Sequence, residues 1–207
     1  MIKISPSILS SNNRIESIKK LNNTNADYLH IDTMDGIFVP NTQMPIEEIL
    51  ELEKHSNIPL DIHLMVNNPE EYIDKLANKN IECITIHIEI DKNIDDLINK
   101  IKSLGYKVGL SLKPNTKVST LLPFLDKIDL VLIMSVEPGF GGQQFMPNSL
   151  NKAKELRELK PNLTLEIDGG INNTNIEEVK KYIDIAVVGS YITKSNDYNQ
   201  AINNLKN

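Results

Sequence analysis

The stretch YLHIDTMDG, residues 28–36, carries the pattern that decides the fold. Side chains alternate between the two faces of a β-strand, so apolar Leu29 and Ile31 share one face. His30 and Asp32 lie together on the opposite face. The stretch therefore predicts a buried strand that presents an imidazole beside a carboxylate near its carboxyl end.

Apolar runs of strand length alternate with amphipathic helical patterns along the chain. The predicted strands span residues 2–8, 27–33, 59–65, 82–88, 107–112, 129–135, 163–168 and 185–189. The predicted helices include residues 46–55, 69–79, 93–105, 149–159 and 174–183. Eight strand–helix units in 207 residues predict a parallel sheet inside a ring of helices, as in a (β/α)8 TIM barrel with a single domain over residues 1–207. A doubly wound sheet is disfavoured, because SPSILSSNN (residues 5–13) stands where a GxGxxG turn would follow the first strand.

The composition narrows the class of protein further. Hydrophobic residues make up 40% of the chain and charged residues 24%, as in ordinary globular proteins. A net charge of −6 without a basic cluster disfavours binding to nucleic acid. The single cysteine, Cys83, excludes an internal disulfide and predicts a buried thiol in a reducing compartment. With no secretory signal pattern and no apolar run of the ~20 residues that span a bilayer, we expect a cytoplasmic protein that binds no membrane.

A barrel of this kind carries its chemistry at the carboxyl ends of the strands, where the polar side chains of this sequence gather. Four of them make a set of two imidazoles and two carboxylates: His30, Asp32, His63 and Asp168. Such a set suits one divalent metal ion, namely Zn, Fe, Mn or Co. A buried hydrogen-bonded network without a metal is the alternative. The metal site is favoured because all four residues stand at strand ends.

The two aspartates of this set suggest acid–base chemistry. Inversion of a carbon next to a carbonyl removes a proton from one face and returns a proton to the other, which two carboxylates on opposite faces can do. Asp32 and Asp168 would need opposite protonation states, which their environments can impose. The cation would polarise the carbonyl and hold the enediolate oxygen.

Other side chains near strand ends have less specific roles. Met34, Met65 and Met134 could line the substrate with polarisable groups that offer no protons, although core packing is the alternative. His87 and Glu89 share a face of the fourth strand, and we predict a structural role for them.

Glycine-rich turns follow the last three predicted strands. They read EPGFGGQQF (137–145), DGGIN (168–172) and VVGSY (187–191). Glycines let backbone N–H groups converge on an anion, and barrels often hold phosphate after strands seven and eight. Each turn alone is consistent with a tight loop, but three together predict a phosphate cradle, to which Ser190 could add a hydroxyl.

The segments SPSILS, YLHIDTMDGIFVPN, DIHLMV, MSVEPGFGGQQF, LEIDGGI and VVGS resemble the ribulose-phosphate 3-epimerases, in order from residue 5 to about residue 193. The resemblance implies a (β/α)8 barrel that interconverts D-ribulose 5-phosphate and D-xylulose 5-phosphate with a bound divalent metal. It implies that the four residues above are the metal ligands, with Asp32 the proton acceptor and Asp168 the donor in one direction. It also implies a phosphosugar substrate and a homo-oligomer. With the methionines, the expected substrate-binding residues are Ser7, Met34, His63, Met65, Met134, Gly139, Phe140, Gly141, Gly142, Asp168, Gly169, Gly170, Gly189 and Ser190.

Two segments depart from the pattern of the family. After VPN the chain reads TQMPIEE and enters a helix early, and KYIDIAVV joins the last predicted helix to the last strand without a small-residue turn. The first change leaves open a six-carbon substrate such as D-allulose 6-phosphate. A phosphosugar lyase is disfavoured, since HIDTMDG (residues 30–36) has no lysine of a DxKxxD run. A non-catalytic phosphate-binding barrel remains the non-enzyme alternative.

Overall fold

The computed structural model describes residues 1–207 and contains all eight predicted strands, each within two residues of its predicted ends. They are β1 Lys3–Pro6, β2 Leu29–Asp35, β4 Leu60–Met65, β5 Ile81–His87, β6 Lys107–Leu112, β7 Leu130–Met134, β8 Thr164–Asp168 and β9 Ile185–Val188. A ninth strand that the sequence does not predict, β3 Thr42–Gln43, pairs antiparallel with the end of β2. The segment after Asn41 thus extends β2 into a short hairpin before the next helix begins.

The strands form one curled sheet in the order β1-β9-β8-β7-β6-β5-β4-β2-β3, and every pair except β2–β3 is parallel. No ladder joins β1 to β2. An isolated bridge between Ser7 and His30 and a hydrogen bond from Asp27 N to Ile4 O link the two strands. The α/β class and the parallel arrangement are confirmed, whereas the ladder is that of a nine-stranded curled sheet rather than an eight-stranded closed ring.

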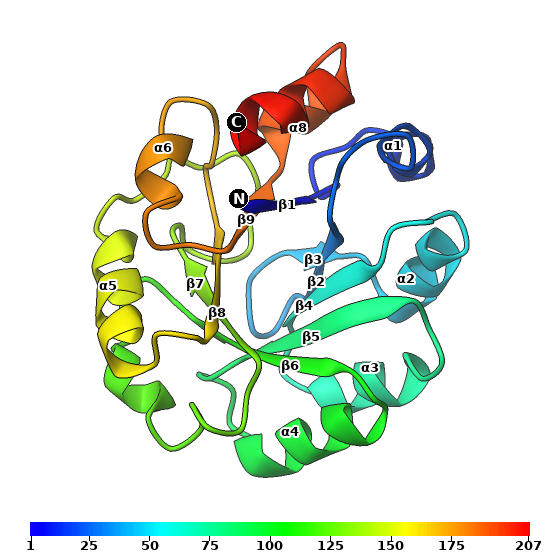
Figure 1. Cartoon of the computed structure of the whole chain (residues 1–207). Helices are drawn as coiled ribbons and strands as arrows, with labels where there is room; N and C mark the ends of the chain where they lie inside the picture. The colour runs from blue at the N-terminus through cyan, green and yellow to red at the C-terminus, as the bar shows by residue number, and fades with distance from the viewer.

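Helices lie outside the curled sheet (Figure 1). They are α1 Arg14–Leu21, α2 Ile46–Glu53, α3 Pro69–Lys75, α4 Ile94–Ser103, η1 Val118–Leu121, α5 Ser149–Leu159, α6 Ile176–Val179, α7 Ser190–Thr193 and α8 Tyr198–Lys206. All five predicted helices form, but the one predicted over residues 174–183 is shortened to α6, because the chain turns after Lys180 to bury Ile183 ahead of β9. None of the helices has the length and apolar character needed to span a bilayer.

The two faces of the sheet differ in chemistry. Outward-facing side chains such as Leu29 and Ile31 join a cluster of 51 buried hydrophobic residues between the sheet and the helices. The inner face carries buried polar groups instead, among them Ser5, His30 and Glu166. This confirms the alternation predicted for residues 28–36. Cys83 is buried as predicted, on the inner face beside Leu130.

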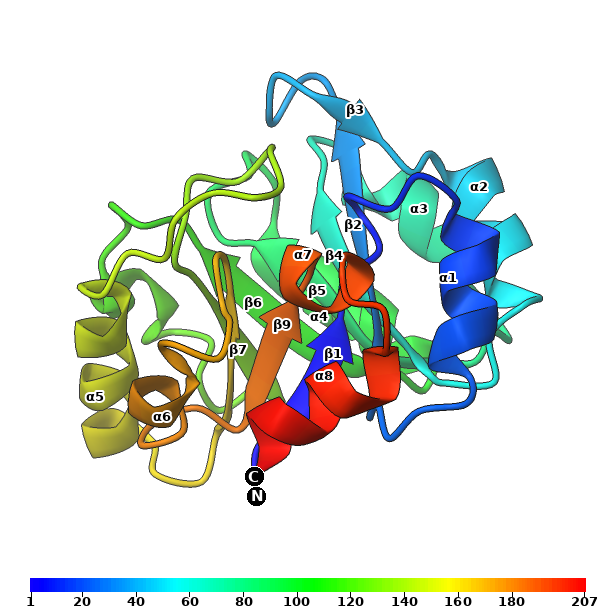
Figure 2. The ribbon, with the colours of Figure 1, turned by 90° about the horizontal axis from the view of Figure 1, so that it is seen from above.

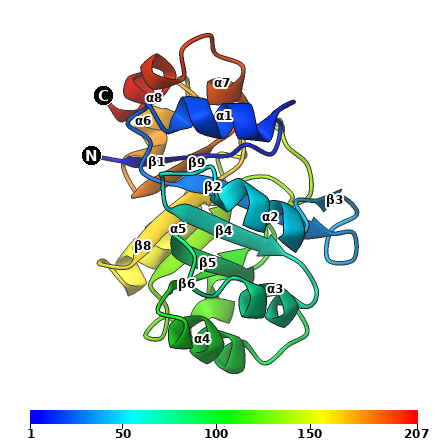
Figure 3. The ribbon, with the colours of Figure 1, turned by 90° about the vertical axis from the view of Figure 1, so that its right-hand side faces the viewer.

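Parallel strands bring all their carboxyl ends to one end of the molecule. Figure 2 shows the arrowheads pointing toward the hairpin of β3, with both termini at the opposite end. Figure 3 shows the same separation from the side. Loops that leave β2, β7 and β8 therefore meet at a single rim, where the functional side chains were predicted.

Candidate active site

The four predicted metal ligands come together on the inner face of the sheet. His30 and Asp32 lie on β2, His63 on β4 and Asp168 at the end of β8. One ligand atom from each of the four lies within 4.8 Å of the others. His30 Nε2 and His63 Nδ1 each stand 3.2 Å from the same atom, Asp32 Oδ1. The prediction that these separated residues converge is thus confirmed as geometry.

Hydrogen bonds behind His30 decide which of its nitrogens faces this cluster. His30 Nδ1 lies 2.6 Å from Asp61 Oδ2, which also accepts a 2.9 Å hydrogen bond from Ser5 Oγ. A carboxylate oxygen only accepts, so the imidazole donates through Nδ1. His30 Nε2 is buried without a hydrogen-bond partner of good geometry and points toward Asp32 and His63. An unpaired nitrogen among carboxylate oxygens fits a bound cation, and the donor set suits a divalent transition metal.

The environment drives the two aspartates to opposite protonation states. Burial disfavours the charge of Asp32, but the charge of His30 and its hydrogen bond overcome this and hold the pKa of Asp32 well below its usual value. Burial and the neighbouring charge of Asp32 raise the pKa of Asp168 to about 7. Burial alone would lower the pKa of His30, but Asp61 and Asp32 raise it well above its usual value. One carboxylate and one carboxylic acid can therefore coexist in this site near neutral pH.

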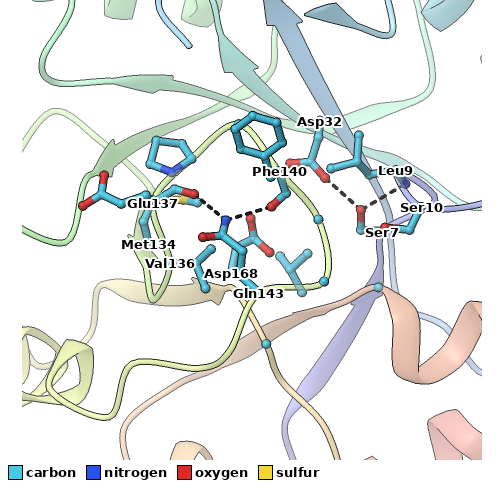
Figure 4. A pocket seen from close by; sticks show the side chains of 18 of the residues that line it. Ser7, Leu9, Ser10, Asp32, Met134, Val136, Glu137, Phe140, Gln143 and Asp168 are labelled. Carbon is cyan, nitrogen blue, oxygen red and sulfur yellow. Dashed lines mark hydrogen bonds between the residues drawn. The ribbon is translucent and has the colours of Figure 1, made fainter. Parts of the chain in front are cut away.

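A pocket opens over this cluster at the rim of the sheet (Figure 4). All the predicted substrate-binding residues line it except His63, which lies buried beneath the pocket floor. Ser7 Oγ donates a 2.8 Å hydrogen bond to Asp32 Oδ2, and Leu9 N donates to Ser7 Oγ at 3.3 Å. The pocket is also lined by residues that are not among those predicted from the sequence, such as Leu9, Ser10 and Ile171.

The glycine-rich loops after β7 and β8 form one wall of the pocket. Ser135 Oγ donates to the carbonyl oxygens of Asp168 at 2.8 Å and Gly169 at 2.7 Å, which ties the two loops together. Gly170 has φ +67°, and a Cβ there would lie 2.3 Å from Phe145 N. Only glycine fits such an approach. Gln143 Nε2, another residue the sequence reading missed, donates to the carbonyl oxygens within its own loop (Figure 4).

Methionines form the apolar part of the lining. Met34, Met65 and Met134 are each buried and line the pocket. Met34 and Met65 also form a small cluster with Val39. Their thioethers offer no strong hydrogen-bond donor to a ligand. The three methionines therefore line the pocket and serve at the same time as core packing; their contact with a substrate stays a prediction.

A second row of buried polar groups stands behind the ligands. Asp61 and Glu166 are buried on the inner face, each two residues before a predicted ligand on the same strand. Glu166 has no hydrogen-bond partner of good geometry, and burial with the charge of Asp61 raises its pKa well above the usual value. Their positions share strand parity with His63 and Asp168, which is the signal in the sequence that could have found them.

Comparison with known sequences identifies the group of proteins to which the chain is similar. The sequence model described as the ribulose-phosphate 3 epimerase family matches residues 3–193. Proteins named ribulose-phosphate 3-epimerase from Helicobacter pylori (strain J99) and Bacillus subtilis (strain 168) are 39% and 36% identical, covering all of this chain and 97% and 99% of their own. The cytoplasmic isoform from Oryza sativa is 42% identical over 84% of this chain and 79% of its own.

Solved structures show a similar fold at low sequence identity. A protein titled KGPDC from Streptococcus mutans superposes with a TM-score of 0.75 at 14% identity, covering 100% of this chain and 96% of that one. The 3-hexulose-6-phosphate synthase from Salmonella typhimurium gives 0.72 at 14% identity over 99% and 96% of the two chains. These likenesses concern the fold alone, whereas the sequence matches have much higher identity, 36–42% against 14%. On their evidence the chain belongs to the ribulose-phosphate 3-epimerase family, whose members are isomerases.

Proposed function

We propose that this chain interconverts D-ribulose 5-phosphate and D-xylulose 5-phosphate by moving the proton at C3, with a divalent metal ion bound. The observation that carries the proposal is the pair Asp32 and Asp168, whose pKa values are shifted in opposite directions and which line one pocket over two imidazoles. We also propose that residues 1–207 act as one domain, an eight-stranded barrel closed where Ser7 meets His30.

In this proposal the glycine-rich loops hold the phosphate. Backbone N–H groups near Gly142, Gly170 and Gly189 would face its oxygens, since these residues line the pocket on adjacent loops. Ser190 would add a hydroxyl. The methionines would lie against the reacting carbons and keep water from them, so that proton transfer is confined to the two acids.

Asp32 and Asp168 would act on opposite faces of C3. Asp32, whose pKa is lowered chiefly by His30, would accept the proton, while Asp168, whose pKa is raised to about 7 by burial and by the charge of Asp32, would donate one from the other side. Ser7 would orient Asp32 through its hydrogen bond to Oδ2. The reverse reaction exchanges the two roles.

The ligands of the metal would be His30, Asp32, His63 and Asp168. A divalent cation held there supplies positive charge against the negative charge that develops on the substrate oxygens as the C3 proton leaves. Zn, Fe, Mn and Co all suit this donor set. The chain's own contribution is to present two imidazole nitrogens and two carboxyl groups at one point.

The wider setting follows from the same proposal. The substrate would be a small phosphosugar, with no role for nucleic acid or a membrane. We propose a cytoplasmic location, in line with the rice relative that is named a cytoplasmic isoform. We also propose a homo-oligomer, whose size can be measured by light scattering.

Proton exchange tests the function directly. Metal-loaded protein incubated with ribulose 5-phosphate in deuterated water should incorporate deuterium at C3 while forming xylulose 5-phosphate. Metal analysis of the purified protein should find about one ion per chain. Well-folded, metal-loaded protein that exchanges no proton would refute the proposal, and binding of phosphosugar without exchange would indicate the non-catalytic barrel instead. Parallel kinetics with allulose 6-phosphate decide between five- and six-carbon substrates.

A further inference from the structure

A hydrogen-bonded chain of side chains leads away from His63 toward the surface. His63 Nδ1 faces Asp32 Oδ1 at 3.2 Å, and His63 Nε2 lies 2.9 Å from Nε2 of His87. His87 Nδ1 in turn lies 2.9 Å from Glu89 Oε2. Both histidines are fully buried, whereas the Glu89 side chain is 19% exposed. The chain thus connects the candidate metal cluster to a carboxylate near the surface.

Hydrogen bonds at the outer end define Glu89 as an acceptor. Its Oε1 accepts from Lys113 N at 2.7 Å and from Thr116 Oγ1 at 2.5 Å, so both donors on that side are aimed at a carboxylate. The hydrogen bond from His87 outweighs the effect of burial and lowers the pKa of Glu89 to about 2. The remaining oxygen, Oε2, therefore accepts a hydrogen bond from His87 Nδ1.

Counting the protons along this series of hydrogen bonds then identifies the donor of each one. A neutral His87 that donates through Nδ1 has an unprotonated Nε2, which can only accept. The contact of 2.9 Å with His63 is a hydrogen bond only if His63 Nε2 carries the proton. His63 Nδ1 then carries none and offers its lone pair toward Asp32. Reversing the order would require Glu89 to donate a proton.

Packing prevents His87 from rotating out of this arrangement. The centroid of its ring lies 5.0 Å from that of the His63 ring, with 29° between the two planes, and 4.7 Å from the centroid of the Phe38 ring. The Lys113 ammonium lies 4.0 Å from the centre of the Phe38 ring on the way to the surface. Rings held between neighbours in this way keep one orientation.

We propose that His87 and Glu89 are positioning residues for His63, fixing its imidazole in the tautomer whose Nδ1 is free to bind a cation beside Asp32 and Asp168. The inference rests on the proposed metal-dependent function and assigns to it two residues outside the pocket. Outer groups that fix ligand tautomers in this way typically contribute about 10- to 100-fold in metal affinity.

Glu89→Gln tests the tautomer assignment with almost no change of shape. The amide oxygen can still accept from Lys113 and Thr116, which turns the NH2 group toward His87 Nδ1 and makes that nitrogen an acceptor. His87 Nε2 would then donate to His63 Nε2, and the His63 proton would move to Nδ1, facing the metal. We expect nitrogen-15 NMR of the metal-free variant to show His63 protonated at Nδ1, with Nε2 protonated in the unmodified protein.

The same variant should bind Zn²⁺ about 10- to 100-fold more weakly in competition with a chelator. Glu82→Gln is the matched control, since Glu82 lies at the other end of β5 and pairs with Lys107 near the surface; its Zn²⁺ affinity and its His63 tautomer should be unchanged. Thr116→Val removes one donor from Glu89 without altering any charge and should weaken Zn²⁺ binding in the same direction by less.

Two results would overturn the inference. One is a Glu89→Gln variant that keeps the original His63 tautomer, and the other is Zn²⁺ affinity equal to that of the Glu82→Gln control. Either result would leave the proposed function intact if the unmodified protein exchanges the C3 proton. Conversely, failure of the unmodified protein to exchange that proton would not alter the tautomer measured by NMR.

Discussion

His30 and His63 meet at the same oxygen of Asp32, yet they are supported in different ways. His30 donates directly to Asp61, a buried carboxylate that also accepts from Ser5. His63 donates to a second imidazole, and the negative charge of Glu89 stands one ring farther away. The pKa of His30 is raised well above its usual value, whereas burial lowers that of His63. The two imidazoles therefore differ in protonation before a metal binds: His30 favours the protonated form and His63 the neutral form.

The largest expected effects come from replacing the two carboxyl groups proposed to move the proton, beginning with Asp32, whose Oδ1 lies near both imidazoles. Asp32→Asn should lower the rate of C3 epimerisation by at least about 10²-fold, because the amide can neither accept the proton nor balance the imidazoles. Asp168→Asn should lose a similar factor by removing the acid. Steady-state kinetics with ribulose 5-phosphate measure both, with Asp74→Asn on the exposed face of α3 as the control. Full activity in either variant would remove that residue from the mechanism.

Next in size is the effect of weakening the support of His30. Asp61→Asn should reduce Zn²⁺ affinity by about 10- to 100-fold, since a neutral amide holds the His30 imidazole less firmly than a carboxylate does. The loss should be at least as large as that for Glu89→Gln, because Asp61 contacts its ligand directly. Chelator competition measures both, and Asp126→Asn at the surface is the control. A smaller loss for Asp61→Asn would reverse the ranking of the two supports.

The protons released on metal binding can be counted by calorimetry. Because the pKa of His30 is raised, Zn²⁺ should displace its proton near neutral pH, and affinity should rise with pH. His63, whose pKa is lowered, should release none. Zn²⁺ titrations in two buffers of different ionisation enthalpy give the total number released, to which Asp168, with a pKa of about 7, also contributes. Asp61→Asn should reduce that number, and an unchanged value would mean that His30 is already neutral.

The smallest effect concerns Asp168, which faces both imidazoles from β8. Its pKa of about 7 exceeds the value near 3.9 expected for an unfolded chain, so the folded state binds this proton more tightly. The stability it contributes is fully present below pH ~3.9 and is lost as pH rises through 7. The free energy of unfolding of the metal-free protein, measured with urea, should therefore fall with pH between about 3.9 and 7. Its slope against pH should be more negative than that of Asp168→Asn by up to about 1.4 kcal/mol per pH unit. Equal slopes would contradict the raised pKa.

Strand order and side-chain parity could be predicted from the sequence, because a period of two is visible in stretches such as residues 28–36. Register between strands could not. His30 lies opposite Asp61 and Asp32 opposite His63 across the β2–β4 pair, and these partners are set by packing of the whole sheet. The sequence therefore predicts only a structural role for His87 and Glu89, since nothing local reveals that His87 reaches His63.

The hairpin of β3 and the short helix α6 show a second limit of sequence patterns. Thr42 and Gln43 have no strand-like run around them, and they pair with β2 because the loop folds back over Met34 and Asp35. Residues 174–183 are amphipathic, but four residues of helix suffice before the chain must reach β9. In both places the tertiary path outweighs local preference.

The hydrogen bond between Ser7 and Asp32 joins the two strands that no ladder connects. It therefore links β1 to β2 as well as forming an active-site contact, because Ser7 follows β1 and Asp32 lies on β2. The junction between these two strands thus lies beside the carboxylate proposed to take the proton. A substitution that displaces β1 relative to β2 should therefore lower the activity without altering any catalytic side chain. Conversely, replacing Asp32 removes a hydrogen bond that holds the two strands together.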